Sequence, residues 1–153
     1  MGIANKNVKD LMSESLIYST PESSLQEIAV MMTEADCGEI PLIRDPDKMD
    51  VIGVITDRDI VCRTLGVGKN PMELLAQDCM TSPAVTASED MSAKECIRLM
   101  QDNKIRRIPV VDQAGRLCGM VAQADFAMVD DDETIEMVQE ISRPSDSASQ
   151  VTH

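Results

Sequence analysis

The chain has 153 residues, which is enough for one domain or two very small ones. Hydrophobic residues make up 43% and charged residues 27%, the balance of a globular protein with a buried core. The net charge of -13 and the scarcity of aromatic side chains (one Tyr, one Phe, no Trp) disfavour nucleic acid and anionic membrane surfaces as partners.

The sequence carries no sign of membrane insertion or of disulfide bonding. The N-terminal segment MGIANKNVKD has no apolar run, and nowhere does the chain approach the ~20 apolar residues of a membrane-spanning helix. The five cysteines form no CxxC pair, and Cys62 and Cys118 follow apolar neighbours, so we expect free, mainly buried thiols and a cytoplasmic location. The single histidine is His153, so we expect no catalysis by a folded imidazole and no metal site.

An internal repeat organises the chain. Residues 10–43 align with residues 78–111 at a constant offset of 68 positions, with seven identities and a matching apolar pattern. The first repeat then contains two additional residues in the segment RDPDKMD, and the offset between the repeats becomes 66. The predicted segments are repeat 1 (8–65), a linker (66–77), repeat 2 (78–130), a C-terminal helix (131–142) and a disordered tail (143–153).

In repeat 1, an extended lead-in IYST precedes Ser24-x-x-Glu27, a spacing typical of a capping box that opens a helix. The apolar run IPLI follows, and Pro41 is predicted to be the first residue of a strand. After the turn DPDK, the run VIGVIT predicts a second strand, and a second helix is expected to open near Asp57.

Repeat 2 shows the same order of elements. The lead-in AVTA precedes Ser92-x-x-Glu95, then come IPVV with Pro109, the turn DQAG, the run LCGMVA and a helix opening near Gln123. Each repeat is therefore predicted to be a helix–strand–strand–helix unit. The linker GVGKNPMELLAQ is expected to be a loop with a short helical turn at MELLA.

The segment Gly53-Val54-Ile55-Thr56-Asp57-Arg58-Asp59 admits two interpretations. Thr56 and Asp59 have the spacing of a helix cap, in which they would satisfy free backbone amides. Alternatively, the Thr56 hydroxyl and nearby amides would take a phosphate while the Asp59 carboxylate accepts hydrogen bonds from a ribose. In repeat 2 the hydroxyl is replaced by Ala122 but Asp125 remains, which favours a further role for the acid.

The repeat, the IPLI and IPVV runs, and the G-h-h-T-x-x-D motif in GVITDRD together resemble the cystathionine-β-synthase-type (CBS) domain pair. The resemblance covers residues ~8–130, and TDRDIV and KIRRIPVVD are similar to stand-alone bacterial two-repeat proteins. It implies an α+β fold in which two repeats form a pseudo-twofold pair packed through their sheets. It also implies clefts for an adenosine ligand such as AMP, ADP, ATP, NAD or S-adenosylmethionine, and a homodimer formed through helices.

The resemblance implies that the first cleft uses Asp59 on the ribose, Thr56 on phosphate, and Val54 beside the base. The lead-in of the other repeat would contact the adenine through Ala84, Val85 and Thr86.

Three arginines are candidate phosphate ligands. The resemblance places Arg106 and Arg107 where the family often carries a basic residue, and a guanidinium matches phosphate well. A solvated pair that balances nearby acids is the alternative. Arg58 would also reach phosphate, or else lie exposed in the first turn of its helix.

The second cleft is expected to bind less well. It would combine Asp125 and Met120 with the lead-in residues Leu16, Ile17 and Tyr18. Ala122 departs from the Ser/Thr of the family, and Glu39 stands at a position where a basic residue would meet phosphate. One good site per chain is therefore expected, with the second cleft empty or holding an uncharged adenosine moiety.

These patterns favour a non-catalytic regulatory module that senses an adenine nucleotide and signals to a protein target. No cofactor is expected to be required. A dimeric interaction or scaffold protein whose clefts have no physiological ligand is the alternative. An enzyme is disfavoured because the chain shows no histidine base, no nucleophile with a partner, no metal set and no P-loop lysine motif.

Overall fold

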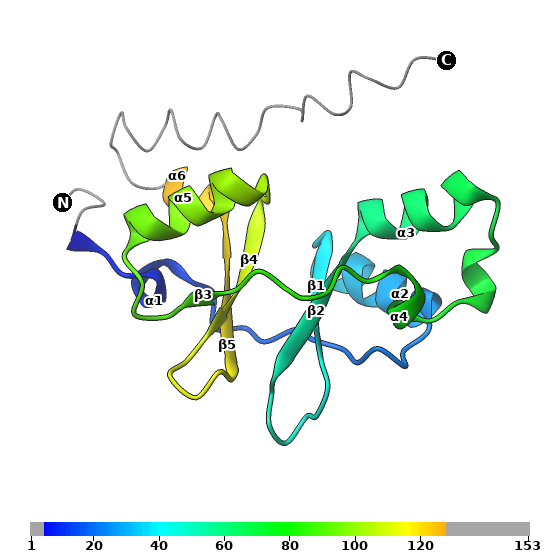
Figure 1. The fold of residues 1–153 in the computed structure, drawn as a ribbon, viewed down its shortest axis with the longest axis horizontal. Coiled ribbons are helices and arrows are strands. Elements are labelled where there is room, and N and C mark those ends of the chain that lie inside the picture. Colours follow the sequence, from blue (N-terminus) through cyan, green and yellow to red (C-terminus); the bar gives the residue numbers. More distant parts are fainter. Residues whose placement is uncertain (1–4, 128–153) are drawn as a thin grey trace, which may run out of the picture. The chain divides into compact units, whose positions relative to one another are not determined.

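The computed structural model describes residues 5–127, which divide into two compact units (Figure 1). The first-repeat unit comprises residues 15–85 and 113–117. The second-repeat unit comprises, within the described residues, 5–14, 86–112 and 118–127. The predicted helix 131–142 and tail 143–153 lie outside the described residues. No helix between residues 5 and 127 is long and apolar enough to cross a membrane.

The first-repeat unit contains the predicted order of helix, two strands and helix, followed by short helical turns. Its elements are α2 (Leu25–Ala35), β1 (Glu39–Ile43), β2 (Val51–Thr56), α3 (Asp57–Arg63), the 3-10 turns η2 (Leu65–Val67) and η3 (Pro71–Glu73), and α4 (Ala76–Cys79). The helical turn expected at MELLA is displaced to η3, because Leu74 is extended and ends it.

β1 and β2 pair antiparallel, from Glu39 opposite Thr56 onward. The lead-in joins β1 in parallel at Ser19, whose N–H donates to the Pro41 carbonyl at 3.1 Å. The prediction that Pro41 begins the strand is wrong, since it is the third residue of β1. Proline is tolerated there because the Ser19 bond uses its carbonyl, and a carbonyl is what proline retains.

α2 begins as the sequence predicts. The Ser24 hydroxyl accepts the Glu27 amide at 3.1 Å, and the Glu27 carboxylate accepts the Ser24 amide at 3.2 Å. The helix then buries Leu25, Ile28 and Met32 at helical spacing. Each such side chain removed from water stabilises the fold by about 1.5–3 kcal/mol.

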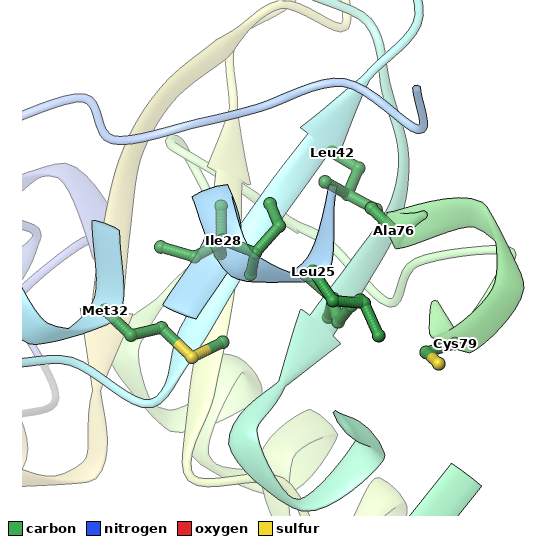
Figure 2. Packing of buried hydrophobic residues seen from close by; sticks show 8 residues of the cluster. Leu25, Ile28, Met32, Leu42, Ala76 and Cys79 are labelled. Atoms are coloured by element: carbon green, nitrogen blue, oxygen red, sulfur yellow. The ribbon is translucent and has the colours of Figure 1, made fainter. Parts of the chain in front are cut away.

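The core of the first-repeat unit joins α2 to the hairpin and to α4. Figure 2 shows Leu42 of β1 beside the α2 residues, with Ala76 and Cys79 of α4 completing the cluster. Two backbone bonds position α4 there: Leu25 N–H donates to Leu74 O at 3.1 Å, and Ala76 N–H donates to Ser23 O at 2.7 Å. The end of the predicted linker is thus part of this core.

The second-repeat unit repeats this construction. Its elements are α1 (Val8–Leu11), β3 (Ala87–Ser88), α5 (Ala93–Asn103), β4 (Arg107–Val111), β5 (Leu117–Ala122), of which residues 118–122 lie in this unit, and α6 (Gln123–Ala127). The sheet has the order β3-β4-β5, with β3 parallel to β4. Pro109 is also the third residue of its strand rather than the first. The α+β class and the tandem helix–strand–strand–helix repeats are confirmed.

A short helix from one sequence repeat packs on the longer helix of the other. In the second-repeat unit, Val8 N–H donates to Met91 O and Ala93 N–H donates to Lys6 O, both at 2.9 Å. These bonds are the counterparts, 68 positions away, of the bonds that hold α4 on α2. The compact units therefore differ from the sequence repeats by an exchange of their leading segments, which contain α1 and α4, and by residues 113–117, which lie in the first-repeat unit.

Close backbone approach explains the glycine shared by the two second strands. A Cβ atom on Gly53 would lie 2.8 Å from Thr81 O. A Cβ atom on Gly119 would lie 2.9 Å from Ser13 O and 2.6 Å from Met12 Sδ. The segment after each short helix thus crosses its strand at a distance that only glycine permits.

Candidate functional site

Thr56 and Asp59 form the capping box of α3. Asp59 N–H donates to Thr56 Oγ1 at 3.0 Å, and Thr56 N–H donates to Asp59 Oδ2 at 3.0 Å. The capping interpretation of the GVITDRD motif is therefore confirmed. It accounts for the hydrogen bond to one carboxylate oxygen of Asp59, Oδ2, but not for the surroundings of the other oxygen.

The second oxygen, Asp59 Oδ1, has only long polar contacts within its unit. The Thr81 hydroxyl lies 3.4 Å from Oδ1 and 3.3 Å from Oδ2, and Arg63 Nη2 lies 3.8 Å from Oδ1. Charge-assisted hydrogen bonds are usually 2.7–2.9 Å long. The Asp59 side chain is 15% exposed, so the carboxylate is sheltered but still reaches the surface.

Both backbone polar groups of Val54 are bonded to Thr81, so only its side chain is left for the predicted contact with a base. Its N–H donates to Thr81 O at 3.0 Å, and its carbonyl accepts the Thr81 N–H at 2.8 Å. Beyond Thr81 the chain runs through Ala84 and Val85, which are half-buried and lie in the same unit. The first-repeat unit thus brings together Val54, Thr56, Asp59 and the start of the predicted adenine-contacting segment.

The predicted phosphate ligands divide between the units. Arg58 is exposed on α3 in the first-repeat unit. Arg106 is exposed and Arg107 half-buried at the start of β4 in the second-repeat unit, which also contains Thr86. The role of these arginines stays a prediction.

The residues predicted for the second cleft are also divided. Asp125 and Met120 belong to the second-repeat unit, whereas Leu16, Ile17 and Tyr18 belong to the first-repeat unit. Leu16 is 42% exposed, while Ile17 and Tyr18 pack against apolar clusters of their unit.

Asp125 keeps half of a capping box. Its Oδ2 accepts the Ala122 N–H at 2.8 Å, although Ala122 has no hydroxyl with which to return the bond. Capping alone therefore explains why an acid persists at this position, so its persistence no longer favours a further role for Asp125.

Two residues in this region were missed by the sequence analysis, Thr81 and Arg63. Both carried a signal. The repeat alignment places Thr81 opposite Ser13, so a hydroxyl stands at the same position in both repeats. Arg63 follows Asp59 by four residues, the spacing at which side chains meet on one face of a helix.

The cysteines differ from the expectation of mainly buried thiols. Cys79 and Cys96 are buried, but Cys62 is exposed on α3, because Ile60 of that helix faces the core and Cys62 does not. Burial raises the pKa of Cys96 to about 12, so this thiol stays protonated and unreactive. Among residues 5–127, no group of three His, Cys, Asp or Glu side chains is placed to hold a metal ion.

The family model for the CBS domain matches the chain twice, over residues 8–64 and 76–132. The chain therefore belongs to the CBS domain family, as the repeat and its motifs predict.

The chain is 37% identical over 124 residues to an uncharacterized protein of Methanopyrus kandleri, a match that spans 81% of this chain and 62% of that protein. It is 33% identical over 122 residues to the CBS domain-containing protein YhcV of Bacillus subtilis, with 80% and 84% of the two chains covered.

The fold is also similar to the CBS domain pair of protein MJ0100, solved in complex with 5′-methylthioadenosine and S-adenosyl-L-methionine. The TM-score is 0.71 at 26% identity, and the match covers 80% of this chain and 98% of that one.

Proposed function

We propose that this chain is a non-catalytic regulatory module that binds an adenosine-containing small molecule, with its ribose on Asp59. The bound nucleoside or nucleotide would act as a signal rather than as a resident cofactor. Membership of the CBS family and the adenosine compounds bound by the MJ0100 pair support this class of ligand.

The single observation that carries the proposal is the state of the Asp59 carboxylate. One oxygen receives the capping amide at 3.0 Å, and the other has polar contacts no shorter than 3.4 Å. Vicinal ribose hydroxyls are donors that would give this oxygen short, charge-assisted hydrogen bonds.

Regulation requires that the ligand bind one conformation better than another. A ligand shifts an equilibrium only by the difference between its affinities for the two states. We infer that the phosphate of a nucleotide would be held by Arg106 and Arg107, since a guanidinium fork suits phosphate. Nucleotides and uncharged nucleosides would then differ in the signal that they produce.

Absorbance provides the first test. With one Tyr and no Trp, the protein absorbs little near-ultraviolet light, so a co-purified adenine compound would dominate the spectrum. Release by heat or acid and chromatography would then identify the compound. Isothermal titration with adenosine, AMP, ATP, S-adenosylmethionine and 5′-methylthioadenosine follows on the stripped protein, and failure of all five to bind would refute the proposal.

The two arginines have a separate test. Replacing Arg106 and Arg107 with Ala is expected to weaken AMP and ATP more than adenosine. Equal losses for all three would indicate that the arginines are structural. The predicted homodimer is checked by light scattering on the same samples, with and without ligand.

A further inference from the structure

Arg63 connects two parts of the candidate site. Its Nη1 donates to the carbonyls of Cys79 and Met80, at 3.1 and 2.7 Å. Its Nη2 lies 3.4 Å from the Thr81 hydroxyl and 3.8 Å from Asp59 Oδ1. One guanidinium thus contacts both the ribose-binding candidate and the segment that leaves α4.

The carbonyl contacts explain why Arg63 has a defined position. Cys79 is the last residue of α4 and Met80 is its C-cap, where carbonyls lack partners within the helix. A cation at a helix C-terminus is favourable, and its hydrogen bonds are charge-assisted. Arg63 is held there although its side chain is 47% exposed.

The contacts to Asp59 are of a different kind. At 3.8 Å the guanidinium does not form the short bidentate pair that would occupy both carboxylate oxygens. The Thr81 hydroxyl lies at nearly equal distances from the two oxygens, 3.4 and 3.3 Å. Both side chains therefore contact the carboxylate, whose Oδ2 is held by the Thr56 amide at 3.0 Å, and they leave Oδ1 without a short hydrogen bond.

We propose that Arg63 and Thr81 are positioning residues that hold the Asp59 carboxylate in place for a ribose diol and tie it to the segment after α4. This inference rests on the proposed function. Because Val54 N–H and C=O both bond to Thr81, the segment after α4 is also hydrogen-bonded to β2. A shift of this segment would then change how the carboxylate meets the sugar.

The second repeat provides an internal comparison. The position that corresponds to Arg63 is Val129 in the sequence, and the position that corresponds to Thr81 is Ser13. Within the described part of the chain, the Asp125 carboxylate receives the Ala122 amide and has no counterpart of the Thr81 contact. The difference favours Asp59 over Asp125 as the ribose ligand.

The test compares adenosine with 2′-deoxyadenosine, which lacks one hydroxyl of the diol. Wild-type protein is expected to prefer adenosine, and Arg63→Ala is expected to reduce that preference roughly 3- to 10-fold, the effect of one hydrogen bond. Thr81→Val is expected to reduce it in the same direction. Arg98→Ala removes an exposed arginine on α5 and serves as the charge-matched control, with its preference unchanged.

Hydrogen exchange on the ligand-free protein tests the tie independently of binding. The Thr81 amide, bonded to Val54 O at 2.8 Å, is expected to exchange faster in Arg63→Ala and at the wild-type rate in Arg98→Ala. Arg63→Lys keeps the charge but not the fork, so it is expected to be intermediate in both measurements. It also supplies a second variant if Arg63→Ala does not fold.

Two outcomes would overturn the inference. If Arg63→Ala weakens the binding of adenosine and 2′-deoxyadenosine equally, Arg63 is purely structural. If the variant keeps both the wild-type preference for adenosine and the wild-type exchange rate of the Thr81 amide, Arg63 has neither proposed role. Wild-type protein that binds none of the adenosine compounds titrated above would instead refute the proposed function, and with it the ribose role. The exchange rate of Thr81 would then still show whether Arg63 holds the segment.

Discussion

Comparing Asp59→Ala with Asp125→Ala separates the capping role of Asp59 from its proposed ligand role, because Asp125 makes the same capping bond in the other unit. Asp59 Oδ2 accepts the Thr56 amide at 3.0 Å, and Asp125 Oδ2 accepts the Ala122 amide at 2.8 Å. We therefore expect Asp59→Ala and Asp125→Ala to lower stability by similar amounts and ligand affinity by very different amounts.

The magnitude follows from the contacts that are lost. A capping hydrogen bond contributes about 0.5–2 kcal/mol. The long contact between Asp59 and the half-exposed Arg63 adds less than about 1 kcal/mol. Each variant should thus lose about 1–2 kcal/mol, and for a chain of this size each kcal/mol lowers Tm by about 2–4 °C. Loss of charged hydrogen bonds to a ribose would weaken binding by roughly 10- to 150-fold.

The assay combines thermal unfolding without ligand and calorimetric titration with the nucleotide identified by release from the protein. Asp59→Asn is the matched control for folding, since its amide oxygen can still accept the Thr56 N–H while the charge is lost. Its Tm is expected to stay near that of the wild type, and its affinity is expected to fall.

Two results would refute this reasoning. An affinity loss for Asp125→Ala that equals or exceeds that for Asp59→Ala would mean that the wrong carboxylate has been assigned to the ribose. A lower Tm with unchanged affinity in Asp59→Ala would mean that this residue only caps α3.

Three further predictions concern packing and the thiols. Gly53→Ala places Cβ 2.8 Å from Thr81 O and is expected to cost about 1–3 kcal/mol by urea denaturation, whereas Gly66→Ala meets nothing closer than 3.5 Å. Equal stabilities would contradict the close approach. Maleimide labelling mapped by mass spectrometry is expected to modify exposed Cys62 long before buried Cys96, and the reverse order would refute the assigned exposures. Burial raises the pKa of Cys96 from 9.0 to about 12 in the folded protein. As the pH rises from 9 to 12, the thiol therefore ionises in the unfolded chain before it does so in the folded one, and the free energy of unfolding decreases. Between pH 8 and pH 10, the free energy of unfolding from urea denaturation is expected to fall less in Cys96→Ala than in the wild type. An identical fall in both proteins would exclude this thiol as a cause of the pH dependence.

Contacts between residues close in the chain could be predicted from the sequence. The capping box of Ser24 and Glu27 joins residues three apart, and the apolar spacing of α2 is a property of one helix. The repeat pointed to the CBS family, and its motif singled out Thr56 and Asp59 as partners. Such local bonds form whenever the segment is helical, whatever surrounds it.

Only the tertiary structure decided which distant segments meet. The placement of α4 on α2, the third position of Pro41 in β1, and the exposure of Cys62 depend on neighbours from elsewhere in the chain. The contacts of Arg63 with the two carbonyls at the C-terminal end of α4 span 16 and 17 residues. The sequence by itself therefore determined the helix–strand–strand–helix order of each repeat and the Asp59 carboxylate in the capping box of α3. The surroundings of that carboxylate were decided by packing, because the buried area gained when segments meet has no signature within either segment.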